Sequence, residues 1–169
     1  MLAAFDNYFS LAEILHDDLS TTLKADYDNQ IWRRNQIRMI IAMAEAYSHC
    51  FREICSVGLE SDAPELSRNE KKVILEEKAF SAPERIKYTL KAFYKMFEIE
   101  PIPDFSDAGW NAAKIAIEKR GALMHPKSAV DLEIEEGLWP EIHQGFVWLL
   151  DTHFNAINYM SKKYLGNAS

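Results

Sequence analysis

The chain has 169 residues, of which 48% are hydrophobic and 12% aromatic, so it can bury one core and is not expected to be disordered. Its formal net charge of -7 disfavours general coating of DNA but does not exclude a local basic cleft. No apolar run approaches the roughly 18 residues that span a bilayer, and the first residues lack the basic region of a signal peptide. We therefore expect one domain over residues 1–169, without a membrane contact.

The first half of the chain shows helical periodicity. A first helix is expected over about residues 5–24 and a second over about residues 29–57. The centre of the second helix is apolar on most sides, which predicts a central position in the fold. Ser67 and Glu70 then form a capping box, which predicts a short helix that ends near Lys78.

The second half of the chain also shows helical periodicity. Ser81 and Glu84 form another capping box, whereas Pro101 and Pro103 exclude a helix from the connector that follows. A further helix is expected from about 106 or 107 to 125, and a last one from about 140 to 166. Because no stretch alternates with period two, the sequence predicts an all-α fold: a bundle of four long helices plus one or two short ones.

The two cysteines, Cys50 and Cys55, fall in one predicted helix and point to different faces of it. Neither belongs to a paired-cysteine motif of the kind that holds a metal. Buried thiols in a reducing cytoplasm are the simplest expectation. The histidines show no metal-ligand spacing, and we expect neither a metal nor another cofactor.

Arg120 is the most informative charged residue of the chain. It falls between Ile117 and Met124 on the apolar stripe of its predicted helix, so it should point toward the packed side. A charge aimed inward is costly unless it is paired. Glu45 is also a charge inside an apolar run, and we therefore expect Glu45 and Arg120 to meet.

His125 follows five residues later and precedes Pro126. Because the residue before a proline disfavours the α region, the helix should end or kink at His125 and release its side chain to the rim of the same site. Gly121, beside Arg120, would let another backbone approach closely.

The segment Arg120-Gly-Ala-Leu-Met-His125, late in an all-α chain and followed by proline, resembles the HEPN superfamily (higher eukaryotes and prokaryotes nucleotide-binding) over about residues 5–165. The resemblance implies a homodimer in which Arg120 and His125 of both subunits line a shared cleft. Many members are metal-independent endoribonucleases of toxin–antitoxin or antiviral systems, and some have an antitoxin protein as partner. Others bind a nucleotide, RNA or a protein without turnover.

The residue types suit RNA cleavage. Histidine exchanges protons near neutral pH, and arginine stays charged and binds phosphate through two donors. Two positions differ from the pattern of catalytic members, which often have a polar residue in place of Gly121 and in some cases a tyrosine in place of Lys127. Three interpretations therefore stay open: an endoribonuclease, a non-catalytic binding module, and a structural subunit in which Arg120 and His125 only fix the packing.

Three arginines, Arg33, Arg34 and Arg38, lie within six positions of the second predicted helix. A solvated face with salt bridges is the ordinary interpretation of such a run. The functional interpretation is a phosphate-binding rim that also includes Lys127, with Trp32 stacking on a base.

Overall fold

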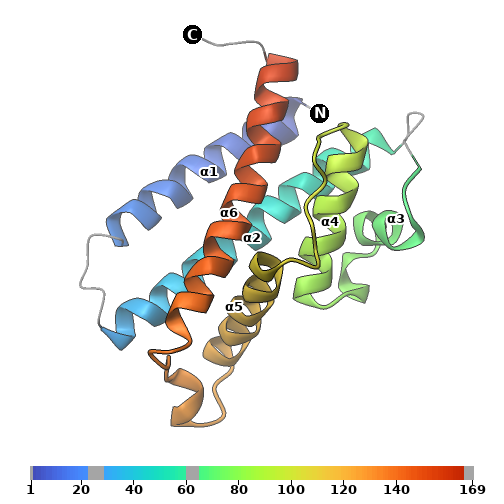
Figure 1. Ribbon diagram of the computed structural model, residues 1–169. Coiled ribbons are helices and arrows are strands. Elements are labelled where there is room, and N and C mark those ends of the chain that lie inside the picture. The colour runs from blue at the N-terminus through green and yellow to red at the C-terminus, as the bar shows by residue number, and fades with distance from the viewer. Residues whose placement is uncertain (1, 23–28, 60–64, 166–169) are drawn as a thin grey trace.

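The computed structural model describes residues 2–22, 29–59 and 65–165, and within them the regular structure is helical (Figure 1). The described residues form six α-helices: α1 (Leu2–Thr22), α2 (Gln30–Gly58), α3 (Arg68–Leu75), α4 (Ala82–Met96), α5 (Ala108–Met124) and α6 (Trp139–Met160). Short 3-10 turns cover Glu77–Ala79 and Ala129–Leu132, and a π turn, Ser161–Leu165, extends α6. The all-α prediction is confirmed. The number of long helices differs, because five helices have 15 residues or more and α3 has eight.

Short polar side chains start the helices where the sequence predicts it. The capping boxes of Ser67 with Glu70 and of Ser81 with Glu84 are both formed, and they satisfy backbone N–H groups that the first turn leaves unpaired. Asp107 starts α5, and its side chain accepts a hydrogen bond from the Trp110 backbone N–H at 2.6 Å. The connector with Pro101 and Pro103 is not helical, as expected. The predicted helix ends at Lys24 and Gly166 lie outside the described residues.

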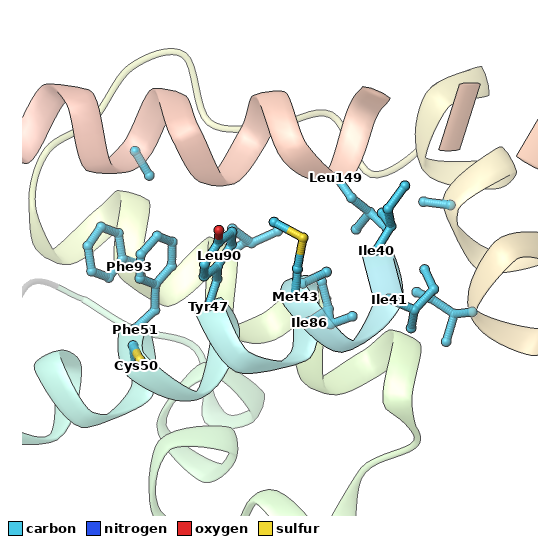
Figure 2. Close-up of a cluster of buried hydrophobic side chains, with 14 of the residues drawn as sticks. Ile40, Ile41, Met43, Tyr47, Cys50, Phe51, Ile86, Leu90, Phe93 and Leu149 are labelled. Carbon is cyan, nitrogen blue, oxygen red and sulfur yellow. The ribbon is translucent and has the colours of Figure 1, made fainter. Parts of the chain in front are cut away.

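Helix α2 is the centre of the fold and contacts each of the other five α-helices, which confirms its predicted place. In Figure 1, α1 lies along one side of α2, and α4 and α5 lie on the other. Figure 2 shows the apolar core between α2, α4 and α6, where the rings of Phe51 and Phe93 stack with centroids 3.9 Å apart. Both cysteines are buried thiols in this core, as predicted, and burial raises the pKa of Cys55.

The contact between α5 and α6 is close enough to fix how α5 is placed. A Cβ atom added to Gly145 of α6 would lie 2.6 Å from the carbonyl group of Ala112 in α5. Only a glycine allows the two backbones this separation. No helix in the described part of the chain is long and apolar enough to cross a membrane.

Candidate functional site

Arg120 and Glu45 form an ion pair between α5 and α2. The Nη2 atom of Arg120 lies 3.2 Å from Oε2 of Glu45, and the two side chains are 29% and 26% exposed. The predicted meeting of these residues is therefore confirmed. Arg120 Nε is buried and has no hydrogen-bond partner in the described part of the chain. Glu45 thus anchors the arginine at one end of its guanidinium, while part of the side chain remains accessible to solvent.

His125 occupies the position that ends α5. The last helical residue is Met124, and the His125 backbone N–H donates to the Gly121 carbonyl at 3.2 Å. The break before Pro126 therefore occurs where the sequence predicts it. The His125 side chain is exposed, and no hydrogen bond joins it to Arg120 within the described residues. Met124 is also exposed, at 45%, so the expected apolar stripe of α5 ends before it.

The loop after His125 is held by Asp131. Its Oδ2 atom accepts hydrogen bonds from the backbone N–H groups of Lys127 at 2.7 Å and Ser128 at 2.9 Å. These hydrogen bonds lower the pKa of the Asp131 carboxyl group below its usual range. The loop is thereby fixed in shape, and the Lys127 side chain points to an exposed surface.

Gly121 lies on an open part of the surface of α5. No atom of the described chain lies within 4 Å of the place where a Cβ would be, and the residue is exposed. The close backbone approach predicted at Gly121 is therefore not made by any of the described residues, and the surface there has space for a second molecule.

Three arginines in the first part of α2, Arg33, Arg34 and Arg38, bond to backbone carbonyl groups. Nη2 of Arg38 lies 3.2 Å from the Leu123 carbonyl, which belongs to the last turn of α5, where carbonyl groups lack helical partners. Nη1 of Arg34 lies 3.0 Å from the Leu132 carbonyl. Nη1 of Arg33 lies 3.5 Å from the Ile134 carbonyl. The arginines thus connect the first part of α2 to the end of α5 and to the segment between α5 and α6.

The expected roles of Trp32 in base stacking and of Arg33 in an exposed phosphate-binding rim are wrong, because both side chains are buried. Arg33 and Trp32 are each 6% exposed, and both pack near Trp139, whose ring centroid is 5.8 Å from the Arg33 guanidinium carbon and 5.5 Å from the Trp32 ring. A buried Trp32 does not offer a face to a base, and a buried Arg33 is not part of an exposed rim. Arg34 and Arg38 are partly buried, and Lys127 is exposed.

Ser48 and His153 form a buried pair that the sequence does not reveal. The Nδ1 atom of His153 lies 2.7 Å from the Leu149 carbonyl, and Nε2 lies 3.1 Å from Oγ of Ser48. Since a carbonyl only accepts, Nδ1 carries the hydrogen. Burial lowers the pKa of His153 to about 4, so the ring is neutral and Ser48 donates to Nε2. So low a pKa makes His153 a weak general base.

A polar cavity opens between α2 and α4, beside Glu45. It has a volume of about 250 Å³ and is lined by Glu45, Ser48, Arg52, Arg85 and Ile86. Sequence reasoning did not identify Arg52 or Arg85. The only signal is that Glu45, Ser48 and Arg52 follow one another at steps of three and four, which places them on one face of α2.

A second cavity, of about 530 Å³, lies between the proline-containing connector and α6. Two carboxylates of this cavity accept hydrogen bonds from nearby backbone groups: Glu100 accepts one from the Ile102 N–H, and Asp104 accepts one from the Ser106 N–H. Within the described residues, no group of three or more His, Cys, Asp or Glu side chains could hold a metal ion.

Comparisons with protein-family models, with curated proteins and with solved structures find no match to this chain.

Proposed function

We propose that the chain acts on RNA as a homodimer of the HEPN kind, with Arg120 and His125 of both subunits at a shared cleft. One observation carries the proposal: the C-terminal end of α5 presents a partly exposed arginine anchored by Glu45, and five residues later an exposed histidine at the helix end. Open space at Gly121 on the same helix end supports a place for a second subunit.

The chemistry uses both residues. The RNA 2′-hydroxyl oxygen attacks the adjacent phosphorus, and the bond to the 5′-oxygen breaks. A neutral His125 takes the proton of the 2′-hydroxyl group, and a protonated His125 gives one to the leaving 5′-oxygen. Arg120 stabilises the extra negative charge on the phosphoryl oxygens. A dimer contains two copies of His125, so one can act as the base and the other as the acid. A single chain has only one His125.

A second candidate is a non-catalytic module that binds a nucleotide, RNA or a partner protein such as an antitoxin. The Glu45–Arg120 ion pair favours it, because the carboxylate already offsets the charge that a transition state would need. A bound phosphate would have to share Arg120 with Glu45. Arg34, Arg38 and Lys127 would extend the phosphate contacts in either case.

The test is RNA cleavage by the purified full chain in the presence of a metal chelator. We expect His125→Ala to abolish cleavage and Arg120→Lys to lower it about 100-fold or more, since lysine cannot make two parallel contacts. His143→Ala is the matched control, because His143 is an exposed histidine of α6. Full cleavage by folded His125→Ala would refute the catalytic proposal. RNA binding by the wild type without cleavage would favour the second candidate.

A further inference from the structure

A cavity of about 530 Å³ lies between α6 and the connector that runs from α4 to α5 in Figure 1. Its wall includes Asp107, the residue that starts α5. Because a helix rises 1.5 Å per residue, Asp107 is about 27 Å from His125 along the axis of α5. The cavity is therefore separate from the proposed RNA site, and neither Arg120 nor His125 lines it.

One face of α6 forms part of the wall of this cavity. Trp148, Thr152, Asn155 and Tyr159 follow one another at steps of four, three and four, which places them on the same side of the helix. The connector contributes apolar residues and two carboxylates, which are Ile99, Ile102, Pro103, Glu100 and Asp104. The cavity thus combines aromatic rings, apolar side chains and negative charge.

Two hydrogen bonds hold the wall together. The Tyr94 hydroxyl group of α4 donates to the Thr152 carbonyl at 2.8 Å, and Nε1 of Trp148 donates to Oδ2 of Asp107 at 3.1 Å. They join α6 to α4 and to the start of α5. The cavity is therefore formed before a ligand enters it, as small-molecule sites usually are.

Most side-chain donors of the wall are used within the protein. Tyr94 and Trp148 donate as described above, and Oγ1 of Thr152 donates to the Trp148 carbonyl at 2.7 Å. Among the described residues, the Asn155 amide and the Tyr159 hydroxyl group are the donors of this wall that remain for a ligand.

Three carboxylates, those of Glu100, Asp104 and Asp107, supply the acceptors and the charge. Oε1 of Glu100 and Oδ2 of Asp104 accept no hydrogen bond from the described residues. The hydroxyl group and the N–H of Ser106, together with the charge of Lys91, hold the pKa of Asp104 below its usual range. Lys91 offsets part of the negative charge, but it does not line the cavity. A ligand that complements this wall must therefore bring donors and positive charge.

The arrangement of the charge favours an organic ammonium ion over a metal ion. A metal ion needs several ligands around one point, and no group of three or more suitable side chains provides this within the described residues. An alkylammonium ion instead uses separate acceptors, an aromatic ring and an apolar surface for its carbon chain. Tyr159 already has an ammonium ion near its ring, because Nζ of Lys163 lies 5.5 Å from the ring centroid.

We propose that this cavity binds a small aliphatic diamine, such as 1,4-diaminobutane. The ammonium groups donate hydrogen bonds to the Glu100 and Asp104 carboxylates, and the carbon chain packs on Ile102 and Pro103. The volume of about 530 Å³ lies within the roughly 300–1,000 Å³ of small-molecule pockets. The site does not depend on RNA cleavage or on dimer formation.

The experiment measures binding of 1,4-diaminobutane to the full chain by calorimetry at about 0.15 M salt, which screens long-range attraction to the net charge of -7. Butylamine, 1,4-butanediol and Mg²⁺ are the other probes. We expect a Kd below about 1 mM for the diamine, binding of butylamine that is about tenfold weaker or more, and none of the diol. Mg²⁺ at the same concentration should not displace the diamine.

Two double variants with the same change of charge locate the site. Glu100→Gln with Asp104→Asn should weaken binding of the diamine by about tenfold or more, since both changes remove a charged acceptor. Glu135→Gln with Glu136→Gln is the matched control, because both residues are exposed and lie outside the cavity. The control should bind the diamine as the wild type does. All four side chains are exposed, so both double variants should fold, and melting curves check this.

Three results would overturn the proposal: no binding of the diamine by the wild type, equal affinities for the diamine and butylamine, or equal losses in the two double variants. The last result would mean that the diamine follows only the net charge of the protein. A lysyl-lysine peptide tests the other source of ammonium groups. Displacement of the diamine by an equal concentration of that peptide would assign the cavity to lysine side chains of a partner, and no displacement assigns it to the free diamine.

Discussion

Arg120 of α5 and Glu45 of α2 meet at 3.2 Å, and both side chains are partly buried. The pair joins the helix that ends at His125 to the central helix of the fold. It also neutralises the carboxylate that lines the cavity between α2 and α4. One ion pair thus belongs both to the end of α5 and to the wall of that cavity.

The strength of this pair can be measured by a double-mutant cycle. Using Arg120→Gln, Glu45→Gln and the double variant, we expect a coupling energy of about 1 kcal/mol in urea unfolding, because both side chains are partly shielded from water. A matched cycle on Lys72 and Glu76, which are 4.0 Å apart and 42% and 69% exposed, should give less than about half of that value. Equal coupling in the two cycles would show that the Arg120–Glu45 pair is an ordinary surface pair.

The stability of the fold should depend on pH through His153. Its pKa falls from 6.5 to about 4 on folding, because burial disfavours the charged ring. Below about pH 6.5 the unfolded chain binds a proton that the folded chain does not, so the free energy of unfolding decreases as the pH falls from 6.5 to 4. The loss should be about 3 kcal/mol. Above about pH 7 this group adds no pH dependence.

His153→Gln removes this titration and provides the comparison. Both proteins contain the same carboxyl groups, so the difference between their urea unfolding curves at about pH 7 and about pH 4 isolates the histidine. The wild type should lose more stability than the variant over this range. If the two lose the same amount, His153 takes up its proton as readily in the folded protein as in the unfolded chain.

Helix starts could be predicted from the sequence because the residues that cause them are close in the chain. Ser67 with Glu70 and Ser81 with Glu84 each satisfy backbone groups within one turn. The contact between Arg120 and Glu45 could be predicted although 75 residues separate them, because Arg120 falls on an apolar stripe and Glu45 inside an apolar run, so each charge needs a partner. Capping residues, and charged residues inside apolar sequence, can both be recognised without a structure.

The environment of the arginines could not be predicted in the same way. Arg34 and Arg38 bond to carbonyl groups of Leu132 and Leu123, and backbone acceptors have no signature in a sequence. The pair of Ser48 and His153 joins residues 105 positions apart, and the cavity of Arg52 and Arg85 exists only because α2 packs against α4. Their positions depend on how the helices are packed, which a periodic pattern does not specify.

Gly145 should tolerate substitution poorly. In Gly145→Ala, the added Cβ would lie 2.6 Å from the Ala112 carbonyl group, so α5 and α6 must move apart. We expect a loss of about 3 kcal/mol in the free energy of unfolding, at the upper end of what overpacking costs. Gly137→Ala is the control, because nothing lies within 4 Å of its Cβ position. Equal stability of the two variants in urea would mean that the contact between the helices is looser than described.

Gly121 gives a prediction that separates the single chain from the proposed dimer. Nothing lies within 4 Å of its Cβ position, and it is an exposed residue of α5, so Gly121→Ala should stabilise the isolated chain by about 0.5–1 kcal/mol. If a second subunit packs its backbone against Gly121, the same substitution should weaken dimer formation by about tenfold or more. Sedimentation at several protein concentrations measures association, and urea unfolding at low concentration measures stability. A stabilised variant that still dimerises as the wild type does would place the contact between subunits away from Gly121.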